Sequence, residues 1–577
     1  MRSANRTLSA TPLHLQHAVL AIEDHRFYQH SGIDWIRTLG AALQGITSVE
    51  RPKGTSSITQ QLARNVYLDR TDAWRRKLNE AAIAVLLERR LSKDEILERY
   101  LNFVPMGHHA SFDIAGVGLA SRVYFGKEAH ELNLPEAAML AGMIQAPSRL
   151  QPKLHPVDAK RRRHLVLAAM KRYGWITDKE FIDADGAELS VGALAATEPG
   201  DFFVDAVGRE MKTVGIDIGR GARVRTTIDM RLQRIVETAA SSWGARLEKR
   251  FKRSGVAPQI AIVAMDPDSG ALRAIAGGTS YAQSQLNRAF AKRAPGSLFK
   301  AFVYAAAFQS SLLKGDARYS PETLIDDSPI EMVWGGERYS PGNYHDTYRG
   351  IISLQEALNL SANSAAVRLA GEVGYAKVAR LARVAGLKGT EATPSAALGS
   401  YDATPVDVAG AYAVFANGGY AVEPHTIDSV ISGSGDTLHS RAGGRTQLLD
   451  PRAAYLTAKM LQGVLVSGTA SRARSLGVLQ PAGGKTGTTK DSWFAGFTSG
   501  LVCVVWVGFD DHRDLGVAGA DGALPIWADV MKQAATLQPY STAKDFRKPV
   551  GVDEYLSAAR DREPEVISGF GSDAPAH

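Results

Sequence analysis

The stretch from Ala294 to Lys300 constrains this chain more than any other. Its sequence is Ala-Pro-Gly-Ser-Leu-Phe-Lys, and the apolar run Ala301–Phe308 follows at once. A Pro-Gly turn before an Ala-rich run predicts a helix whose first turn holds Ser297. Residues three apart share a helix face, about 5–6 Å apart at Cβ, so the Lys300 amine can reach the Ser297 hydroxyl. An amine among apolar side chains has a lowered pKa, and the pattern therefore predicts a serine nucleophile with its base.

Two later motifs decide between this interpretation and an exposed Ser and Lys on a helix. The triplet Ser361–Asn363 falls in a helix predicted over 354–370, where a plain polar face would look the same. Lys485–Thr488 (Lys-Thr-Gly-Thr) precedes a β-rich run and predicts an edge strand on which Gly487 lets a substrate backbone approach, although a simple turn is the alternative. S-x-x-K, S-x-N and K-T-G in this order resemble the signature of penicillin-binding proteins and serine β-lactamases.

This resemblance implies an acyl-transfer site. Ser297 would attack a D-Ala-D-Ala stem peptide to form an acyl-enzyme, and Lys300 would take its proton. Ser361 and Asn363 would relay the proton and hold the peptide. The third motif, which would bind the substrate carboxylate and align its backbone, consists of Lys485, Thr486, Gly487 and Thr488. β-Lactams would acylate Ser297 instead.

Length and charge indicate the number of domains and the kinds of binding partner. At 577 residues the chain exceeds one hydrophobic core, so two or three domains are expected. An excess of 67 Lys and Arg over 60 Asp and Glu suits an anionic membrane surface or a pyrophosphate-bearing substrate. No nucleic-acid motif is present, and we interpret the basic cluster Lys160–Arg163 as a solvated helix face.

The remaining single-residue features predict no further chemistry. Cys503, the one cysteine, lies in an apolar run and is interpreted as a buried strand residue. The scattered histidines match no metal-ligand motif, so no metal site is predicted from them. No apolar run spans a bilayer, so either the chain is cytoplasmic or an export signal and membrane anchor are missing from the sequence as given.

The N-terminal third carries several motifs that are ambiguous one by one. Glu23 and Asp24 end an apolar helical face, where a solvated acidic pair is the alternative to a cleft carboxylate. The polar, Gly-led segment 54–65 opens into a helix and suits a sugar or a phosphate, or simply caps that helix. Arg76 and Lys77 precede Glu80 by four and three residues, which a plain salt-bridge set would also do. Helices are predicted over 81–90, 93–102 and 135–144.

In this order and spacing the motifs resemble the peptidoglycan glycosyltransferase domain of bifunctional, class A penicillin-binding proteins, over roughly 12–175. The resemblance implies that Glu23 is the general base for the acceptor sugar's 4-hydroxyl and that Glu80 helps the pyrophosphate depart, with Mg²⁺ or Mn²⁺ as an optional cofactor. Arg76 and Lys77 would neutralise that pyrophosphate. The residues implied to line the cleft are Ser57, Gln61 and Asn65. The segment 105–113 departs from the family pattern, so no role is carried over to it.

The resemblance also implies the partners and the location. The substrates would be lipid II, nascent glycan strands and D-Ala-D-Ala stem peptides, and no nucleic acid is expected. The chain would act at the membrane surface, on the periplasmic or extracytoplasmic face, and we expect its N-terminal anchor to be absent from this sequence.

The predicted architecture is multidomain. A mainly α, lysozyme-like glycosyltransferase domain (1–185) is followed by a linker domain (186–255), an α+β transpeptidase domain with a central antiparallel sheet (256–540) and a loosely held tail (541–577). Short strands are predicted at 202–205 and 224–229, a helix at 231–247, a hairpin at 260–276, and two strands that meet near 498–500.

Two other functions use part of the same pattern. A serine D,D-carboxypeptidase or β-lactamase shares the three motifs but hydrolyses the acyl-enzyme, and the N-terminal region argues against it. An inactive wall-binding scaffold would be expected to have lost one of Glu23, Glu80, Ser297, Lys300 or Lys485, and all five are present.

Overall fold

The computed structural model divides the chain into two compact units, Met1–Glu198 and Pro199–His577. It describes residues 7–36, 56–67, 73–109, 112–147, 149–152, 155–188, 200–216, 222–251, 256–433, 435–441 and 443–569. Each unit is considered by itself below. In the described part of the chain, no helix is both long and apolar enough to cross a bilayer.

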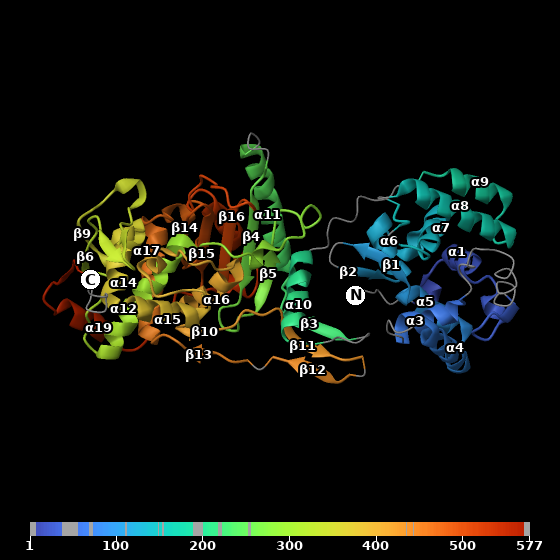
Figure 1. Ribbon diagram of the computed structural model, residues 1–577, viewed down its shortest axis with the longest axis horizontal. Coiled ribbons are helices and arrows are strands. Elements are labelled where there is room, and N and C mark those ends of the chain that lie inside the picture. The colour runs from blue at the N-terminus through green and yellow to red at the C-terminus, as the bar shows by residue number, and fades with distance from the viewer. Residues whose placement is uncertain are drawn as a thin grey trace. The chain divides into compact units, whose positions relative to one another are not determined.

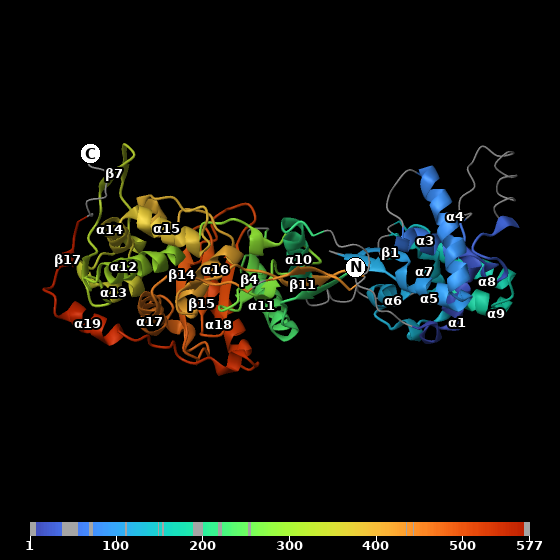
Figure 2. The same ribbon diagram turned by 90° about the horizontal axis from the view of Figure 1, so that it is seen from below.

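The first unit is mainly helical (Figures 1 and 2). Its main elements are α1 (Leu13–Glu23), α3 (Ile58–Tyr67), α4 (Ala73–Arg90), α5 (Lys93–Phe103), β1 (Pro105–His109), β2 (Phe112–Ala115), α6 (Val117–Phe125), α7 (Leu134–Met143), α8 (Pro156–Arg172) and α9 (Asp178–Gly186). One apolar core joins α1, α3 and α5–α8. The helices predicted over 93–102 and 135–144 are confirmed as α5 and α7, whereas the helix predicted from 81 begins earlier, at Ala73.

Capping residues explain where several of these helices begin. The Ser92 side chain accepts from the Glu95 backbone N–H at the start of α5, and Asn133 does the same for Glu136 at the start of α7. Both are capping boxes, in which the Glu side chain bonds back to the cap residue. The sequence around 105–113, which departs from the family pattern, forms the β1–β2 hairpin.

A five-stranded antiparallel sheet lies at the centre of the second unit. Its strand order is β14 (Gly483–Thr488), β15 (Ser492–Phe497), β16 (Val502–Gly508), β4 (Gln259–Met265) and β5 (Leu272–Ala276). The predicted hairpin and the two strands meeting near 498–500 are confirmed, and so is the edge position of β14. Cys503 is buried in β16, as predicted.

Helices cover both faces of this sheet (Figure 1). Side chains alternate between the two faces along a strand, and on β15 the ring of Phe494 packs against Trp527 whereas Phe497 packs against Tyr412. The first contact places α18 (Ala523–Ala534) on one face, together with α11 (Met230–Arg250), and the second places α16 (Pro405–Ala416) on the other. α17 (Pro451–Ser467) packs on β14 and on α12 (Lys300–Lys314).

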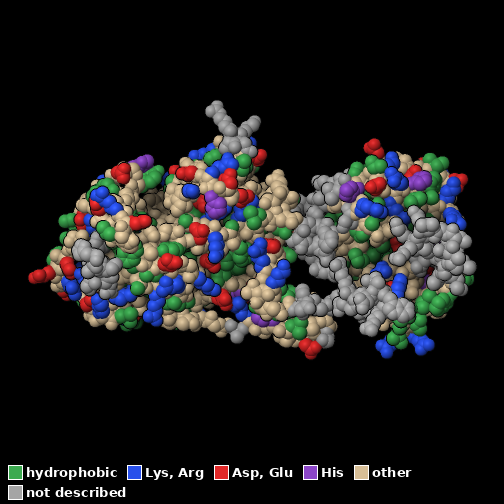
Figure 3. Space-filling view, in the orientation of Figure 1, with side chains coloured by type: hydrophobic (Ala, Val, Ile, Leu, Met, Phe, Trp, Pro, Cys, Tyr) green, Lys and Arg blue, Asp and Glu red, His purple; other side chains and the backbone are tan. Residues whose placement is uncertain are grey.

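The smaller elements complete the second unit. They are α10 (Asp201–Thr213), β3 (Arg223–Thr226), β6 (Leu324–Asp326), β7 (Met332–Trp334), β8 (Glu337–Tyr339), β9 (Ile351–Ser353), α13 (Leu354–Leu360), α14 (Asn363–Val373), α15 (Tyr375–Ala385), β10 (Tyr420–Ala421), β11 (Ile427–Ile431), β12 (Thr437–Ser440), β13 (Thr446–Gln447), α19 (Val552–Arg560) and β17 (Val566–Ile567). On the face drawn in Figure 3, basic side chains are spread among acidic and neutral ones.

Of the three elements predicted in the segment after residue 186, the structure contradicts one and confirms two. The strand predicted at 202–205 is wrong, because these residues lie in α10, where Phe202 and Phe203 are buried on one side of an amphipathic helix. The strand at 224–229 and the helix at 231–247 are confirmed as β3 and α11. The described part of this segment, from residue 200 onward, belongs to the second unit, where α11 packs on β4 and β5.

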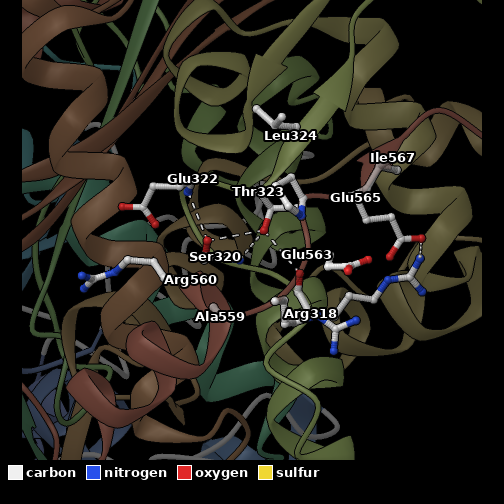
Figure 4. A pocket seen from close by; sticks show the side chains of 12 residues that line it. Arg318, Ser320, Glu322, Thr323, Leu324, Ala559, Arg560, Glu563, Glu565 and Ile567 are labelled. Carbon is white, nitrogen blue, oxygen red and sulfur yellow. Dashed lines mark hydrogen bonds and ion pairs between the residues drawn. The ribbon is translucent and has the colours of Figure 1, made fainter.

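The prediction of a loosely held C-terminal tail is wrong for the residues up to 567. β17 pairs in parallel with β6, and the Tyr555 hydroxyl donates to the Tyr319 carbonyl oxygen at 2.5 Å. A pocket of about 300 Å³ is lined by residues from 318–324 and from 559–567. Arg318, which lines it, forms an ion pair with Glu565 at 3.0 Å (Figure 4). Local composition could not predict these contacts, because they join residues more than 200 positions apart. Residues 570–577 lie outside the described part.

Candidate active sites

The structure places the predicted residues in two sites, one in each unit. We call Glu23, Gln61, Lys77 and Glu80 the carboxylate site, and Ser297, Lys300, Ser361, Asn363 and Lys485 the serine site.

In the carboxylate site, Glu23 ends α1 and is held from α3 and α5. The Gln61 carboxamide donates to Glu23 Oε2 at 2.8 Å, and the buried Tyr100 hydroxyl donates to Gln61 Oε1 at 3.0 Å. Burial raises the pKa of Tyr100 well above its ordinary value, so this hydroxyl stays a donor. The chain of hydrogen bonds fixes the Glu23 carboxylate in one orientation.

A second carboxylate lies on α4, next to a cation. Glu80 is 1% exposed, and its Oε2 accepts from Lys77 Nζ at 2.9 Å. The Lys77 side chain is half exposed and also donates to the Ser56 hydroxyl, just before α3, at 2.6 Å. Helix α3 therefore connects the two carboxylates through hydrogen bonds. Gln61 on this helix donates to Glu23, and Ser56, just before the helix, accepts from Lys77, which also donates to Glu80.

The other three residues predicted for this site differ in their positions and contacts. Ser57 is buried as a cap of α3: its hydroxyl accepts from the Gln60 backbone N–H at 3.1 Å and donates to the Gly32 carbonyl oxygen. Asn65 is half buried on α3, one turn beyond Gln61. Arg76 belongs to α4, but its side chain lies outside the described residues.

Two interpretations of charged residues in this unit are wrong. Asp24 is not part of a solvated pair, because its buried carboxylate accepts from the Ile58 backbone N–H at 3.0 Å and from His30. The interpretation of the whole basic cluster as a solvated face is also wrong: Lys160 and Arg161 are exposed, but Arg163 is 2% exposed and donates to the Asp185 and Ala187 carbonyl oxygens.

Arg162 from the same cluster was missed as a site residue. Burial lowers the pKa of its guanidinium, and the Glu23 carboxylate acts in the opposite direction, so Arg162 interacts electrostatically with Glu23. The apolar residues Ala159, Val166 and Met170 recur at helical spacing around it, and this periodicity is the signal that marks the cluster as partly buried.

In the serine site, Ser297 lies in a 3-10 turn, Gly296–Phe299, that leads directly into α12. Two close approaches fix this turn against its neighbours. A Cβ on Gly487 of β14 would lie 2.5 Å from the Pro295 carbonyl oxygen, and a Cβ on Gly399 would lie 2.0 Å from that of Gly296. Gly296 itself has φ +59°, a conformation that favours glycine. Gly487 is thus required by the packing of β14 on the nucleophile turn, which is a different reason from the predicted approach of a substrate backbone.

Lys300 is fully buried and reaches the second motif. Its Nζ lies 2.5 Å from the Ser361 carbonyl oxygen, 2.6 Å from Asn363 Oδ1 and 3.2 Å from Ser361 Oγ. Burial and the nearby Lys485 lower the pKa of Lys300 well below its ordinary value, against the opposing effect of Asp327. Among the described residues, none forms a hydrogen bond with the Ser297 hydroxyl, which leaves this hydroxyl open to a substrate.

The helix predicted over 354–370 is wrong at its centre, because it is broken at the motif itself. α13 ends at Leu360, Ser361 adopts φ +59°, Ala362 is extended, and α14 begins at Asn363. A non-glycine residue in this left-handed region costs about 1–3 kcal/mol and is typical of functional sites. The break turns both oxygens of Ser361 toward Lys300.

The third motif contributes a second buried lysine. Lys485 Nζ donates to Ser361 Oγ at 2.9 Å and to the Thr486 carbonyl oxygen at 3.2 Å, and burial lowers the pKa of Lys485 to about 7. The Thr486 hydroxyl pairs with that of Thr469 at 2.7 Å, a residue that no sequence motif pointed to. Thr488 is exposed, and its hydroxyl accepts from the Gly519 backbone N–H at 3.0 Å.

Comparison with known proteins finds a separate family model for each unit. The "Transglycosylase" family model matches residues 2–171, and the "Penicillin binding protein transpeptidase domain" model matches residues 260–532. Penicillin-binding protein 2D of Bacillus subtilis is 35% identical over 556 residues, which cover 93% of this chain and 77% of that protein. The chain belongs to the class A penicillin-binding proteins.

Other relatives extend the likeness over nearly the whole chain. Penicillin-binding protein 1A of Aquifex aeolicus is 32% identical over 94% of this chain and 84% of its own length. The crystal structure of penicillin-binding protein 1A from Haemophilus influenzae has the same fold, with a TM-score of 0.59, 23% identity and coverage of 93% of this chain and 90% of that one. This class A penicillin-binding protein is a peptidoglycan glycosyltransferase and transpeptidase.

Proposed function

We propose that Ser297 is the acylated nucleophile of the transpeptidase and that Lys300, held neutral, is its base. The contacts of Lys300 carry this proposal. A neutral amine has two hydrogens and one lone pair. The two hydrogens are used by acceptors that cannot donate, the Ser361 carbonyl oxygen and Asn363 Oδ1. The lone pair is therefore left for a hydroxyl proton, from Ser361 or from Ser297 one helical turn before Lys300.

The orientation of the Asn363 carboxamide supports this assignment. Its Nδ2 donates to the Gly342 carbonyl oxygen at 2.6 Å, so its Oδ1 faces Lys300. Ser361 Oγ accepts from Lys485 and touches Lys300, so this hydroxyl can pass a proton between the base and the leaving amine.

The chemical steps then balance. Ser297 Oγ forms a bond to the carbonyl carbon of the penultimate D-Ala while its proton passes to Lys300 Nζ. The C–N bond to the last D-Ala breaks, and that nitrogen takes a proton through Ser361. The amine of a second stem peptide then displaces Ser297, which regains its proton, and the cross-link is formed. We assign to the exposed Thr488, at the end of β14, the alignment of the donor peptide along that strand.

For the glycosyltransferase we propose that Glu23 takes the proton of the acceptor's 4-hydroxyl as that oxygen bonds to the donor sugar carbon and the bond to the pyrophosphate of lipid II breaks. Gln61 donates to Glu23 Oε2 and orients its carboxyl group for this step. Glu80 orients Lys77, whose half-exposed ammonium faces the leaving pyrophosphate.

The divalent cation suggested by the resemblance stays a prediction. In the part of the chain that the structure describes, no three His, Cys, Asp or Glu side chains converge on a common point. No step above passes through a cation. Because lipid II is held in a membrane, we propose that the enzyme works at the extracytoplasmic surface of the cytoplasmic membrane.

The two activities can be tested separately on the full chain. Intact mass after incubation with benzylpenicillin is expected to show one covalent adduct on the parent and none on Ser297→Ala. Polymerisation of labelled lipid II is expected to continue in Ser297→Ala and to stop in Glu23→Gln. An adduct that survives Ser297→Ala, or polymer formed by Glu23→Gln at the parent rate, overturns the corresponding assignment.

A further inference from the structure

Helix α14, which begins with the catalytic Asn363, has no cap of its own. The residue before it is Ala362, which offers no side-chain acceptor to the first N–H groups of the helix. The Asn343 carboxamide supplies one from elsewhere in the chain: its Oδ1 accepts from the Asn363 N–H at 2.6 Å and from the Ser364 N–H at 3.1 Å.

The Asn343 carboxamide is itself held in one orientation. Its Nδ2 donates to Asp327 Oδ1 at 2.8 Å and to the Thr347 carbonyl oxygen at 3.1 Å. Asp327 is 1% exposed, and its second oxygen accepts from the Arg349 N–H at 3.2 Å. A flip of the amide would set its oxygen against a carboxylate and its hydrogens against two N–H groups, so only the observed orientation is satisfied.

The same segment also grips the side chain of Asn363. Gly342, next to Asn343, accepts from Asn363 Nδ2 through its carbonyl oxygen at 2.6 Å. The main-chain N–H of Asn363 thus binds Asn343, and its side chain binds Gly342. Asn363 Oδ1 in turn holds the Lys300 amine at 2.6 Å. The position of the base therefore depends on a segment twenty residues before the S-x-N motif.

The turn that carries Asn343 is strained. His345 and Asp346 have φ +55° and +50°, and the Asp346 N–H bonds back to the Asn343 carbonyl oxygen at 3.0 Å. Non-glycine residues persist in this conformation only where the surroundings over-determine them, typically at functional sites. Here the strained turn brings the Thr347 carbonyl oxygen within reach of the Asn343 amide.

We propose that Asn343 is a positioning residue of the transpeptidase: oriented by Asp327, it caps α14 in place of Ala362 and so holds Asn363, and through it Lys300, in register with Ser297. This inference rests on the roles proposed above for Ser297 and Lys300. It adds a residue pair outside the three motifs.

The test measures benzylpenicillin acylation of the full chain by time-resolved intact mass, with the acylation rate and the concentration for half-maximal rate obtained separately. Asn343→Ala is expected to lower the maximal rate about 10- to 100-fold, because small displacements of reacting groups have effects of this size. The half-saturating concentration is expected to change less than about threefold, since Asn343 does not touch the ligand.

Asn287→Ala is the matched control. Asn287 is also buried, 2% exposed against 9% for Asn343, and its Nδ2 donates to the Phe202 carbonyl oxygen at 2.9 Å and to Asp205 Oδ2 at 3.0 Å. The variant therefore loses the same two kinds of donated bond, to a carbonyl oxygen and to a carboxylate, without touching Asn363, whereas the two bonds that Asn343 Oδ1 accepts have no counterpart at Asn287 among the described residues. Its acylation rate is expected to stay within about threefold of the parent. An equal loss in both variants would mean that general destabilisation, and not positioning, explains Asn343→Ala, and would overturn the proposal.

A double-mutant cycle tests the link to Asp327. Asn343→Asp keeps the acceptor for α14 but sets two carboxylates against each other, and it is expected to slow acylation about as much as Asn343→Ala. Adding Asp327→Asn restores a donor–acceptor pair and is expected to recover at least about tenfold of the rate. No recovery, or a parent-like rate in Asn343→Ala, overturns the positioning role. A parent that forms no adduct would instead overturn the proposed function itself.

Discussion

In the carboxylate site the buried Glu80 lies against the ammonium of Lys77, whereas in the serine site two buried lysines lie against one hydroxyl, that of Ser361. Lys77 is 51% exposed, and Lys300 and Lys485 are not exposed at all. Among the described residues, no carboxylate forms an ion pair with either lysine of the serine site. The carboxylate site pairs a lysine with a carboxylate near the surface, and the serine site buries two lysines together.

The difference follows from what each site must do. A site that expels a pyrophosphate needs cations that stay charged, and an exposed Lys beside a carboxylate does so. A site that takes a proton from a serine needs an amine that loses its own proton easily, and burial next to a second lysine lowers the pKa of Lys300 in that direction. In the roles proposed above, the same type of side chain thus faces a leaving group in one unit and acts as a base in the other.

The largest expected effect comes from the same substitution in both sites. Arginine keeps its charge and cannot act as a base. Lys300→Arg is expected to lower benzylpenicillin acylation about 10³-fold or more, since it removes the general base. Lys77→Arg is expected to lower lipid II polymerisation less than about tenfold, because the charge beside Glu80 remains.

Intact mass and a gel assay of glycan strands measure the two effects, and thermal unfolding of each variant shows that it is folded. Acylation of Lys300→Arg at a rate near that of the parent would mean that Lys300 is not the base. A loss in Lys77→Arg as large as that in Lys300→Arg would remove the contrast between the two sites.

A smaller effect is expected from the rigid packing around Ser297. Gly487→Ala places a Cβ against the Pro295 carbonyl oxygen and must displace the nucleophile turn, so acylation is expected to fall about 10²-fold. The control is Gly500→Ala, because nothing lies within 4 Å of a Cβ at Gly500. Polymerisation should be the same in both variants and in the parent. Normal acylation in Gly487→Ala would show that the turn tolerates displacement.

How much of this could be predicted from sequence depended on whether a feature was local. The sheet strands were predictable because β4, β15 and β16 are apolar runs bounded by turn residues, and α5 and α7 because their caps adjoin a periodic helix. The three motifs of the serine site were recognisable for the same reason, since each is a few consecutive residues.

What was missed depends on contacts between distant segments. The break of the helix at Ser361 is stabilised by Lys300, about sixty positions earlier, and helix periodicity runs straight through it. Asn343 looks like an ordinary turn residue until the structure shows that Ala362, the residue before α14, provides no side-chain cap for that helix. Arg163 was misjudged because charge was weighed above the apolar spacing around it. In each case tertiary contacts override local preference.

The smallest expected effect concerns stability and has opposite signs in the two units. Lys485 has a pKa of about 7 in the folded protein and near 10.5 when exposed, so the unfolded state binds more protons between these values and stability rises with pH across that window. Below about pH 7 the buried amine is charged and its desolvation is uncompensated. Lys485→Met is therefore expected to stabilise the second unit by about 1–4 kcal/mol at pH 6 and by less at pH 9.5.

Glu80→Gln should destabilise the first unit by less than about 1 kcal/mol, because its partner Lys77 is half exposed. Calorimetry of the full chain at both pH values measures this, with the second unit's transition identified in the parent as the one that benzylpenicillin shifts. Destabilisation by Lys485→Met at pH 6 would mean that its hydrogen bonds to Ser361 and Thr486 outweigh the cost of burying the charge.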